Sequence, residues 1–293
     1  MTVDGHALKL SNLDKVFWKN EGYTKLDLIN YYAEVAPVLL PHLRDRPLSL
    51  HRHPDGADGK SFFQKNTEGL APAWAQTILL EGENGGPVRY LVGRDRATLL
   101  FVANLGCIEI HPWLSRVSHL NRPDFLVLDL DPLDVPFSAV VEVALAAKGV
   151  LDELGLGGYP KTSGATGIHI YLPFSGRYDY AQARHFGEVL ALRLHARLPH
   201  LTSVERLPAH RRGRVYLDWL QNGEGKTVVA PYSLRPGPEA PVSTPLRWEE
   251  LTPDLRPEQF TLRTLPARLR KVGDLFAPVL GEGLDLSPLA RAA

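Results

Sequence analysis

The stretch that most constrains the fold of this chain is residues 124–132, which read DFLVLDLDP. Its apolar residues are typical of a short buried strand, whose successive side chains point to opposite faces. Leu128 and Leu130 are therefore expected to face a core, while Asp129 and Asp131 share the other face. The proline that closes the stretch ends the strand, because it has no amide hydrogen to give to a neighbouring strand.

Two carboxylates on one face of a strand repel each other unless a proton or a cation lies between them. The pair Asp129 and Asp131 therefore favours a divalent-metal site. The alternative is a strand end that points two acids into water. Asp218 adds weight to the metal interpretation, because it lies late in a second apolar, strand-like run at residues 215–221. Three oxygen ligands suit Mg²⁺ or Mn²⁺, and two such ions about 3.5–4 Å apart support phosphoryl transfer.

Composition limits the domain size, the kind of nucleic-acid binding and the cellular compartment that can be expected. The 293 residues suffice for one large domain or two modest ones, and the formal net charge is zero. Any binding of nucleic acid must then rely on local basic patches, such as residues 210–214 (HRRGR), which otherwise form a solvated loop. The single cysteine, Cys107, fits a reducing cytoplasm. No apolar run approaches the roughly 18 residues of a membrane helix, and the start lacks a signal-peptide pattern, so we expect a cytoplasmic protein without membrane contact.

A helix is predicted to begin near residue 25. Thr24 is a good N-cap, and Asp27 follows it with the spacing of a capping box. Lys25 then lies in the first turn, where its charge opposes the helix dipole. It is either a solvated surface lysine or an anion contact beside free helix N–H groups. The residues expected to form the buried stripe of this helix are Leu28, Tyr32, Val35 and Leu39.

Four further features lie between this helix and the acidic strand. Phe62 and Phe63 are adjacent in a short strand that cannot bury both rings on one face, so one is expected to be exposed, as a surface ring or as a stacking platform for a base. A Gly-rich turn is predicted at residues 81–90, and a buried helix at residues 96–106. His111 ends the following strand as a core histidine or a ligand contact.

From residue 124 to 220 the predicted order is strand, helix, strand, strand, helix, strand, which resembles a split βαβ arrangement. This order places the three acids on one antiparallel sheet. The loop SGATG at 163–167 joins the two middle strands and is either a simple hairpin turn or a phosphate-binding loop, in which Ser163 offers a hydroxyl and the glycines free backbone N–H groups. Residues 226–235, which contain Lys226 and Arg235, are predicted to form another strand, and a short helical tail is predicted at about 257–275.

The blocks DFLVLDLDP, KTSGATGIHIYLP, VYLDWLQN and KTVVAPYSLR resemble the signature blocks of the polymerase domain of bacterial ligase D, a member of the archaeo-eukaryotic primase superfamily. The blocks NLDKVFW, FFQKN and IEIHPW also match, so the resemblance runs from about residue 8 to about 275. It implies an α+β fold with mixed and antiparallel sheets and an RRM-like catalytic module flanked by helices. It also implies a template-dependent nucleotidyltransferase that fills gaps and extends 3′ ends at DNA breaks in non-homologous end joining.

The resemblance also assigns roles. The acids matching Asp129, Asp131 and Asp218 hold two divalent cations, Mn²⁺ or Mg²⁺, and act in catalysis. Positions that match nucleotide-binding residues, which contact the triphosphate, the base or the sugar of an NTP or dNTP, are Ser163, Gly164, Thr166, His169, Lys226, Arg235, His111, Phe62, Phe63 and Gln221. Positions that match residues recognising the 5′ phosphate at a gap or break are Asn12, Lys15 and Lys25.

The chain departs from the family at two positions. Many relatives have a lysine in the phosphate loop where this chain has Thr166, which would weaken triphosphate binding, and His51 stands where some relatives carry a longer cation. No ligase or phosphoesterase segment follows in this sequence, so the chain is either a stand-alone polymerase or an excised domain. A stand-alone polymerase, associated with the nucleoid, is expected to need a separate DNA ligase and the end-binding protein Ku as partners.

The expected organisation is one domain over 1–293, with an N-terminal portion at about 1–120, a catalytic module at about 121–235 and a C-terminal wrap at about 236–293. Two alternative functions remain. One is a phosphatase or glycosyltransferase that uses DLD as a metal motif, although Leu133 stands where a haloacid-type phosphatase needs threonine. The other is a non-catalytic module that binds DNA ends, against which the three acids argue.

Overall fold

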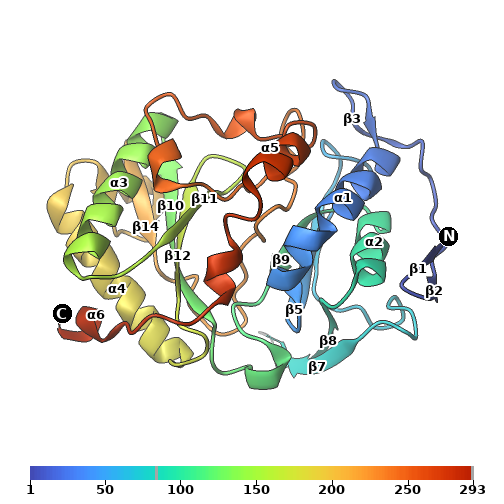
Figure 1. Cartoon of the computed structure of the whole chain (residues 1–293), viewed down its shortest axis with the longest axis horizontal. Coiled ribbons are helices and arrows are strands. Elements are labelled where there is room, and N and C mark those ends of the chain that lie inside the picture. The colour runs from blue at the N-terminus through green and yellow to red at the C-terminus, as the bar shows by residue number, and fades with distance from the viewer. Residues whose placement is uncertain (83–84, 292–293) are drawn as a thin grey trace. The chain divides into compact units, whose positions relative to one another are not determined.

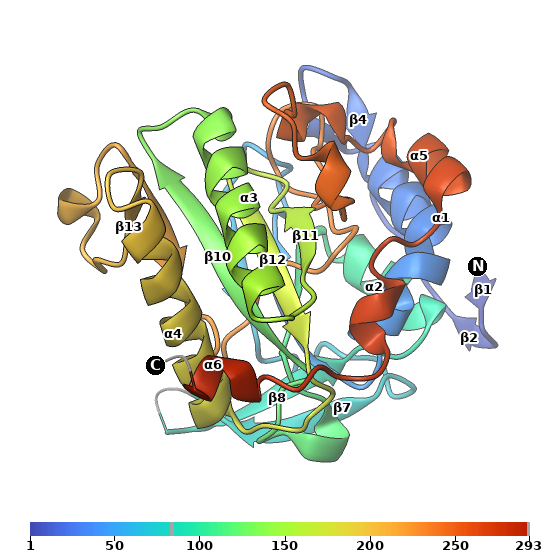
Figure 2. The same cartoon turned by 60° about the vertical axis from the view of Figure 1, so that its left-hand side comes forward.

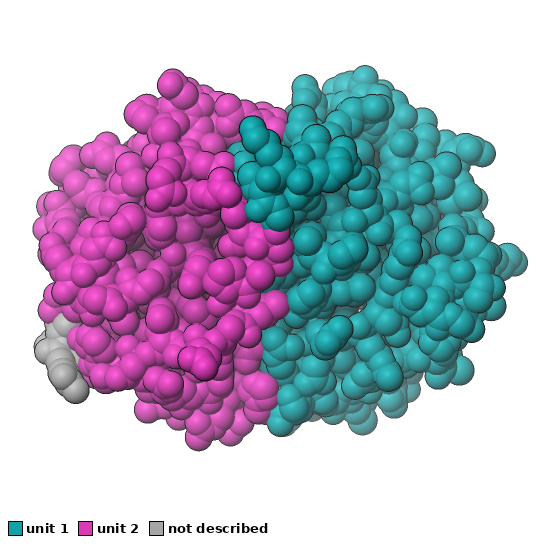
Figure 3. All heavy atoms as spheres, viewed as in Figure 1, with its two compact units in different colours: residues 1–118, 227–243, 260–273 teal, residues 119–226, 244–259, 274–293 magenta. Residues whose placement is uncertain are grey.

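The computed structural model describes residues 1–82 and 85–291 (Figure 1), and Figure 2 gives a second view. The Gly-rich turn predicted at 81–90 includes residues 83–84, which lie outside the described residues. Internal contacts divide the chain into two compact units, coloured separately in Figure 3. Unit 1 comprises residues 1–118, 227–243 and 260–273, and unit 2 comprises residues 119–226, 244–259 and 274–293.

Unit 2 is built on a five-stranded sheet with the strand order β11-β12-β10-β14-β13. The central strand β10 pairs antiparallel with β12 and β14, while β13 pairs parallel with β14. The predicted order of strands and helices from 124 to 220 is confirmed, with the short β13 added. The bounds are β10 Phe125–Leu133, α3 Phe137–Glu153, β11 Tyr159–Thr162, β12 Ile168–Pro173, α4 Tyr180–Arg197, β13 Thr202–Ser203 and β14 Arg214–Asp218.

One face of this sheet is apolar and is covered by α3 and α4 (Figure 2). Leu128 and Leu130 of β10 lie on that face and are fully buried, as the period of two predicted. The close approach of α4 favours a glycine at 187, since a Cβ there would lie 3.1 Å from the side chain of Leu126 of β10. The two helices thereby fix the sheet, and the acids of β10 are left on the opposite face.

Asn222 completes the part of β10 that β14 does not reach. Its Oδ1 accepts a hydrogen bond from the backbone N–H of Val127 at 2.7 Å, and its Nδ2 donates to the Val127 carbonyl oxygen at 2.7 Å. The side chain of Asn222 is fully buried, so it replaces a neighbouring strand at this point of the acid-bearing strand.

Replacing Asn222 by alanine is expected to lower the free energy of unfolding by about 2–4 kcal/mol, because both backbone groups of Val127 would be left buried and unpaired. Chemical denaturation followed by circular dichroism measures the change. Asn20→Ala on the exposed surface is the matched control, with an expected change within about 0.5 kcal/mol. An unchanged unfolding midpoint for Asn222→Ala would contradict this role.

Unit 1 contains a second sheet, with the order β6-β5-β8-β7 and with β9 also paired to β5. Helices α1 and α2 pack against each other beside it. Two small hairpins, β1 with β2 and β3 with β4, precede α1. The bounds are β1 Thr2–Val3, β2 His6–Ala7, β3 Val16–Trp18, β4 Tyr23–Thr24, α1 Lys25–Leu43, β5 Pro47–Arg52, β6 Phe62–Gln64, β7 Thr77–Glu81, β8 Pro87–Val92, α2 Arg96–Asn104 and β9 Cys107–Pro112.

Helix α1 begins as the sequence predicted. Thr24 is its N-cap and forms a capping box with Asp27. The four residues of the expected stripe, Leu28, Tyr32, Val35 and Leu39, are all fully buried. The predicted helix after residue 96 is confirmed as α2, which Asp95 caps by accepting a hydrogen bond from the Thr98 N–H. Among the described residues, no helix combines the length and the apolar character needed to cross a bilayer.

The prediction of a strand at residues 226–235 is wrong. This segment forms only isolated bridges, at Thr227 and Leu234, and its backbone turns at Tyr232, whose φ is 66°. The predicted helical tail is confirmed in part, since α5 lies within it. The remaining helical elements are η1 Val117–His119, η2 Pro208–His210, η3 Trp248–Glu250, η4 Pro257–Gln259, α5 Leu265–Val272, η5 Ala277–Leu280 and α6 Ser287–Arg291. The boundaries predicted for three portions of a single domain stay a prediction.

Candidate active site

The three acids lie on one face of the sheet in unit 2. Asp129 is directly opposite Asp218 of β14, and on its other side it is opposite His169 of β12. Directly opposed residues of antiparallel strands share a face, with Cβ atoms about 4.5–5.5 Å apart. Asp131, two residues along β10, shares that face as well. Asp129, Asp131 and Asp218 are called the acid row below.

The protein orients the carboxylate of Asp218 from its own chain. Its Oδ1 accepts a hydrogen bond from the Leu220 N–H at 2.8 Å, and its Oδ2 accepts one from Gln221 Nε2 at 3.0 Å. Gln221, which was expected at the nucleotide, therefore lies against an acid of the row. A carboxylate fixed by two donors keeps lone pairs free in a set direction, which favours its use as a ligand.

Asp131 is the acid of the row whose pKa is shifted. Burial raises the pKa of its carboxyl, and the charge of Asp218 raises it further, while Arg211, 3.7 Å away, acts in the opposite direction. Three close acids that are partly removed from water would be stabilised by a divalent cation. Their hard oxygen donors fit Mg²⁺ or Mn²⁺.

His169 is held by a residue that the sequence reasoning did not single out. Lys161 of β11 is fully buried, and its Nζ lies 2.9 Å from His169 Nδ1. A lysine ammonium has only donors, so Nδ1 accepts and the ring hydrogen is on Nε2. That Nε2 lies 3.4 Å from Asp129 Oδ1. Lys161 thus orients His169 and directs its N–H toward the acid row.

The loop between β11 and β12 is tight. Ser163 Oγ accepts hydrogen bonds from the N–H groups of Ala165 and Gly167, at 3.1 and 3.0 Å. The N–H of Gly167 is therefore directed at a side chain and not at a bound anion, contrary to expectation. The Ser163 hydroxyl keeps its own hydrogen to donate. A Cβ at Gly167 would lie 2.5 Å from the Leu130 carbonyl oxygen, and Gly164 has a φ of 75°, so both glycines are structurally required.

The other expected nucleotide-binding residues divide between the two units. In unit 2, Thr166 at the tip of the loop and Lys226 are both exposed. In unit 1 the set consists of Phe62, Phe63, His111 and Arg235. Residues 210–214 contribute Arg211 to the acid row through its ion pair with Asp131.

Phe62 and Phe63 of β6 are both exposed, at 46% and 53%, although only one exposed ring was expected. The ring of His51 stacks on Phe63 with centroids 4.2 Å apart and an interplanar angle of 5°. His111 meets the same ring edge-on at 5.2 Å, and the Arg52 guanidinium lies 5.3 Å from the centre of Phe62. Exposed aromatic faces supported from below suit stacking against a flat apolar partner such as a base.

Beneath these rings lies a buried carboxylate that the sequence reasoning missed. Glu109 of β9 lies 2.7 Å from His51 Nδ1, 3.1 Å from His111 Nε2 and 2.9 Å from Arg235 Nη1. Burial by itself would raise the pKa of Glu109, but hydrogen bonds from His111 and His51 and the charge of Arg235 outweigh it and hold that pKa well below its ordinary value. Burial, the largest influence on His111, lowers the pKa of its imidazole. Arg235, expected at the triphosphate, is paired with Glu109.

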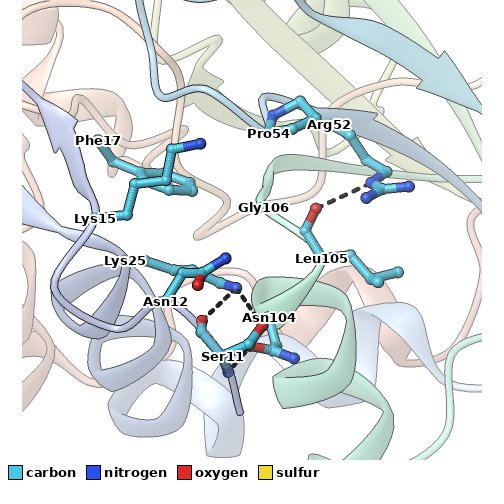
Figure 4. Close-up of a pocket in the computed structure, with 10 residues that line it drawn as sticks. All are labelled: Ser11, Asn12, Lys15, Phe17, Lys25, Arg52, Pro54, Asn104, Leu105 and Gly106. Carbon is cyan, nitrogen blue, oxygen red and sulfur yellow. Dashed lines mark hydrogen bonds between the residues drawn. The ribbon is translucent and has the colours of Figure 1, made fainter.

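The three residues expected at a 5′ phosphate lie together in unit 1 (Figure 4). Asn12, Lys15 and Lys25 line one pocket of about 260 Å³. The structure adds Arg52 from the end of β5 and Asn104 from the end of α2, neither of which the sequence reasoning included. Sequence positions more than 90 apart thus supply one cluster of cations and amides, which suits an anion.

The chemistry of this pocket centres on Lys25. Its Nζ donates to the Ser11 carbonyl oxygen at 2.7 Å, as Figure 4 shows. Burial lowers the pKa of Lys25, and the charges of Lys15 and Arg52 lower it further. The helix N–H groups expected to be free are not, because the N–H of Lys25 donates to Lys15 O and that of Leu26 to Leu13 O. An anion in this pocket would therefore be contacted by side chains and not by these two N–H groups.

The mixed α+β fold, with a helix-covered antiparallel sheet that carries the acid row, defines a primase-like polymerase domain of the archaeo-eukaryotic class. The sequence matches the family described as LigD, primase-polymerase domain, over residues 24–276. The chain belongs to that family, which confirms the resemblance and the predicted fold class.

Individual LigD proteins are also similar to this chain. The chain is 36% identical over 271 residues to the bifunctional non-homologous end joining protein LigD of Bacillus subtilis, covering 92% of this chain and 43% of that protein. It is 37% identical over 271 residues to the multifunctional LigD protein of Pseudomonas aeruginosa, covering 92% and 32%. The chain thus spans less than half the length of these relatives. The polymerase domain of Mycobacterium tuberculosis ligase D, solved in complex with DNA, superposes with a TM-score of 0.88 at 32% identity, covering 95% of this chain and 99% of that one.

Proposed function

We propose that this protein is a template-dependent nucleotidyltransferase that adds NTPs or dNTPs to the 3′ end of DNA at gaps and double-strand breaks in non-homologous end joining. The observation that carries this proposal is the acid row, with Asp129 opposite Asp218 and Asp131 on the same face. Membership of the LigD primase-polymerase family supports it. The proposed partners are broken DNA, Ku and a DNA ligase activity, and the proposed place of action is the nucleoid in the cytoplasm.

In this mechanism the acid row would hold two divalent cations, Mn²⁺ or Mg²⁺, which when bound activate the primer 3′ hydroxyl and neutralise charge at the α-phosphate. The side chains supply the remaining functions. Asp218, oriented by Gln221, keeps its lone pairs directed at the row. His169, oriented by Lys161, presents an N–H to the departing pyrophosphate, together with the cation of Lys226.

The proposed nucleotide contacts are assigned residue by residue. The Ser163 hydroxyl donates to the triphosphate, and the exposed faces of Phe62 and Phe63 stack against the base. His111 is proposed to lie near the sugar. Arg235 would serve the triphosphate while its Nη1 stays paired with Glu109. The pocket of Asn12, Lys15 and Lys25 would bind the 5′ phosphate on the far side of a gap.

The decisive assay is extension of a labelled primer on a gapped duplex with a 5′ phosphate, in the presence of Mn²⁺ and NTPs or dNTPs. Templated growth of the primer supports the proposal. Release of phosphate or transfer of a sugar would instead indicate a DxD-type phosphatase or glycosyltransferase. Retention of DNA without any product would indicate an end-binding module.

Restoring the cation that many family members carry in the phosphate loop tests the role of that loop. Thr166→Lys is expected to lower the KM for the nucleotide by up to about fivefold, because an added exposed charge pair is worth at most about 1 kcal/mol. Thr166→Met, which adds similar bulk without charge, should leave KM unchanged. Equal KM values for both variants would show that the loop tip does not reach the triphosphate.

A further inference from the structure

A second group of metal-ligating side chains lies in unit 1, on strand β5, the segment that follows it, and β9. His51 and His53 each offer a ring nitrogen, and Glu109 offers a carboxylate oxygen. These ligand atoms all lie within 4.8 Å of one another. The group differs in chemistry from the acid row, since two of its three donors are imidazoles.

His53 is the residue of this group that needs explanation. Its side chain is 3% exposed, and within the described part of the chain neither of its ring nitrogens has a hydrogen-bond partner. Glu109 Oε1 lies 3.9 Å from Nε2, and the backbone of Ala57 also lies near the ring. A buried polar ring without partners costs free energy, so an unpaired imidazole directed at a carboxylate points to a missing ligand.

The two oxygens of Glu109 have separate surroundings. Oε2 faces His111 Nε2 at 3.1 Å and Arg235 Nη1 at 2.9 Å, and these groups orient the carboxylate. Oε1 faces His51 Nδ1 at 2.7 Å and His53 Nε2 at 3.9 Å. Hydrogen bonds alone account for Glu109 and His51, but they leave His53 unexplained. A cation bound at Oε1 accounts for all three.

The spacing suits a tetrahedral transition metal. Bonds of about 2.0–2.1 Å to Zn²⁺ place neighbouring ligand atoms roughly 3.3 Å apart. The separations of 2.7 and 3.9 Å from Glu109 Oε1 bracket that value. Two imidazoles and one carboxylate are a donor set that Zn²⁺ takes in proteins, whereas Mg²⁺ prefers oxygen ligands throughout. Hydrogen bonds to the second carboxylate oxygen are the usual support of a metal ligand.

We propose that His51, His53 and Glu109 bind one transition-metal dication of the Zn²⁺ class. Formation of this site depends neither on the proposed polymerase reaction nor on ions at the acid row. A metal bound here would also affect Phe63, because the ring of His51 stacks on the ring of Phe63. A metal at Nδ1 of His51 fixes the plane of that ring and thereby supports Phe63. Metal binding should also raise the melting temperature, since it ties β5 to β9.

Titration with Co²⁺, a spectroscopic substitute for Zn²⁺, tests the site without reference to activity. The protein is first stripped with a chelator and carries Asp129→Asn and Asp131→Asn, which disable the acid row. We expect one equivalent of Co²⁺ to bind, with the visible absorption of a four-coordinate ion, and to be displaced by Zn²⁺ but not by excess Mg²⁺. His51→Phe and His53→Phe should each weaken binding on the order of a hundredfold.

His51→Phe keeps an aromatic ring against Phe63 and alters a half-buried position, so it carries the test even if His53→Phe does not fold. His200→Phe, at an exposed histidine, is the control and should bind Co²⁺ normally. Circular dichroism without metal verifies folding. The proposal is overturned if no stoichiometric binding occurs in the protein with the disabled acid row, or if His51→Phe binds Co²⁺ as tightly as the parent.

Discussion

Replacing Asp129 or Asp131 by asparagine is expected to reduce primer extension by about a thousandfold or more. Asparagine keeps the size of the side chain but removes the charge that would hold divalent cations. Charge stabilisation by bound metal is worth several kcal/mol in the transition state, and each 1.4 kcal/mol is a tenfold change in rate. Alanine at either position should be equally inactive. The measurement is single-turnover extension of a labelled primer on a gapped duplex with Mn²⁺.

The matched control is Asp134→Asn, which alters an exposed acid just beyond the same strand. It should extend primers at the parent rate. Because the acid row is proposed for chemistry and not for holding DNA, the Asp129 and Asp131 variants should retain the parent affinity for the gapped duplex. Normal extension by either variant would refute the metal assignment, whereas loss of DNA binding would place these acids in a different role.

The local pattern of the chain predicted the acidic strand and its two faces. A period of two assigns Leu128 and Leu130 to the core and Asp129 and Asp131 to the other face, and the structure has this arrangement. The pattern could not predict which residue lies opposite Asp129, because that depends on the register between strands far apart in the chain. The predicted strand order placed Asp218 on the same sheet, and the family resemblance assigned it to the metal site, but neither gave the register that sets it directly opposite Asp129.

The residues that the sequence reasoning missed depend on the same long-range register. Lys161 and Glu109 are charged residues inside short apolar strands, which is a signal that could have been used, since such residues are rarely buried unless paired. Their partners, His169 for one and His51 with Arg235 for the other, lie on other segments. Sequence spacing therefore could indicate that these residues matter but not what they contact.

The prediction of a strand at residues 226–235 was wrong because long-range contacts, and not local composition, determine the conformation of this segment. Its apolar run, TVVAPYSL, has the composition of a strand, but Pro231 lacks an amide hydrogen and Tyr232 adopts a positive φ. The segment is held instead by tertiary contacts. Ser233 Oγ accepts a hydrogen bond from the Ile110 N–H, and the Tyr232 carbonyl oxygen accepts one from Tyr31. Tertiary contacts of this kind override local propensity.

Lys25→Met is expected to remove most of the preference for a 5′ phosphate at the gap, by about ten- to a hundredfold in relative affinity. The charge-assisted contact that it deletes is worth about 1.5–3 kcal/mol. Methionine keeps the length of the buried stem, so the N-terminus of α1 should remain intact. The measurement is the ratio of dissociation constants for gapped duplexes with a 5′ phosphate and with a 5′ hydroxyl. Lys19→Met, at an exposed lysine nearby, should leave this ratio unchanged.

The pH dependence of that ratio separates a direct phosphate contact from a general loss of positive charge. In the free protein, burial and the charges of Lys15 and Arg52 lower the pKa of Lys25. A bound phosphate would favour the charged amine and raise that pKa again, so binding takes up protons at alkaline pH. The phosphate preference of the parent should therefore fall as pH rises above the lowered pKa of Lys25, whereas the small residual preference of Lys25→Met should not. A preference that is independent of pH in both proteins would mean that Lys25 does not contact the 5′ phosphate.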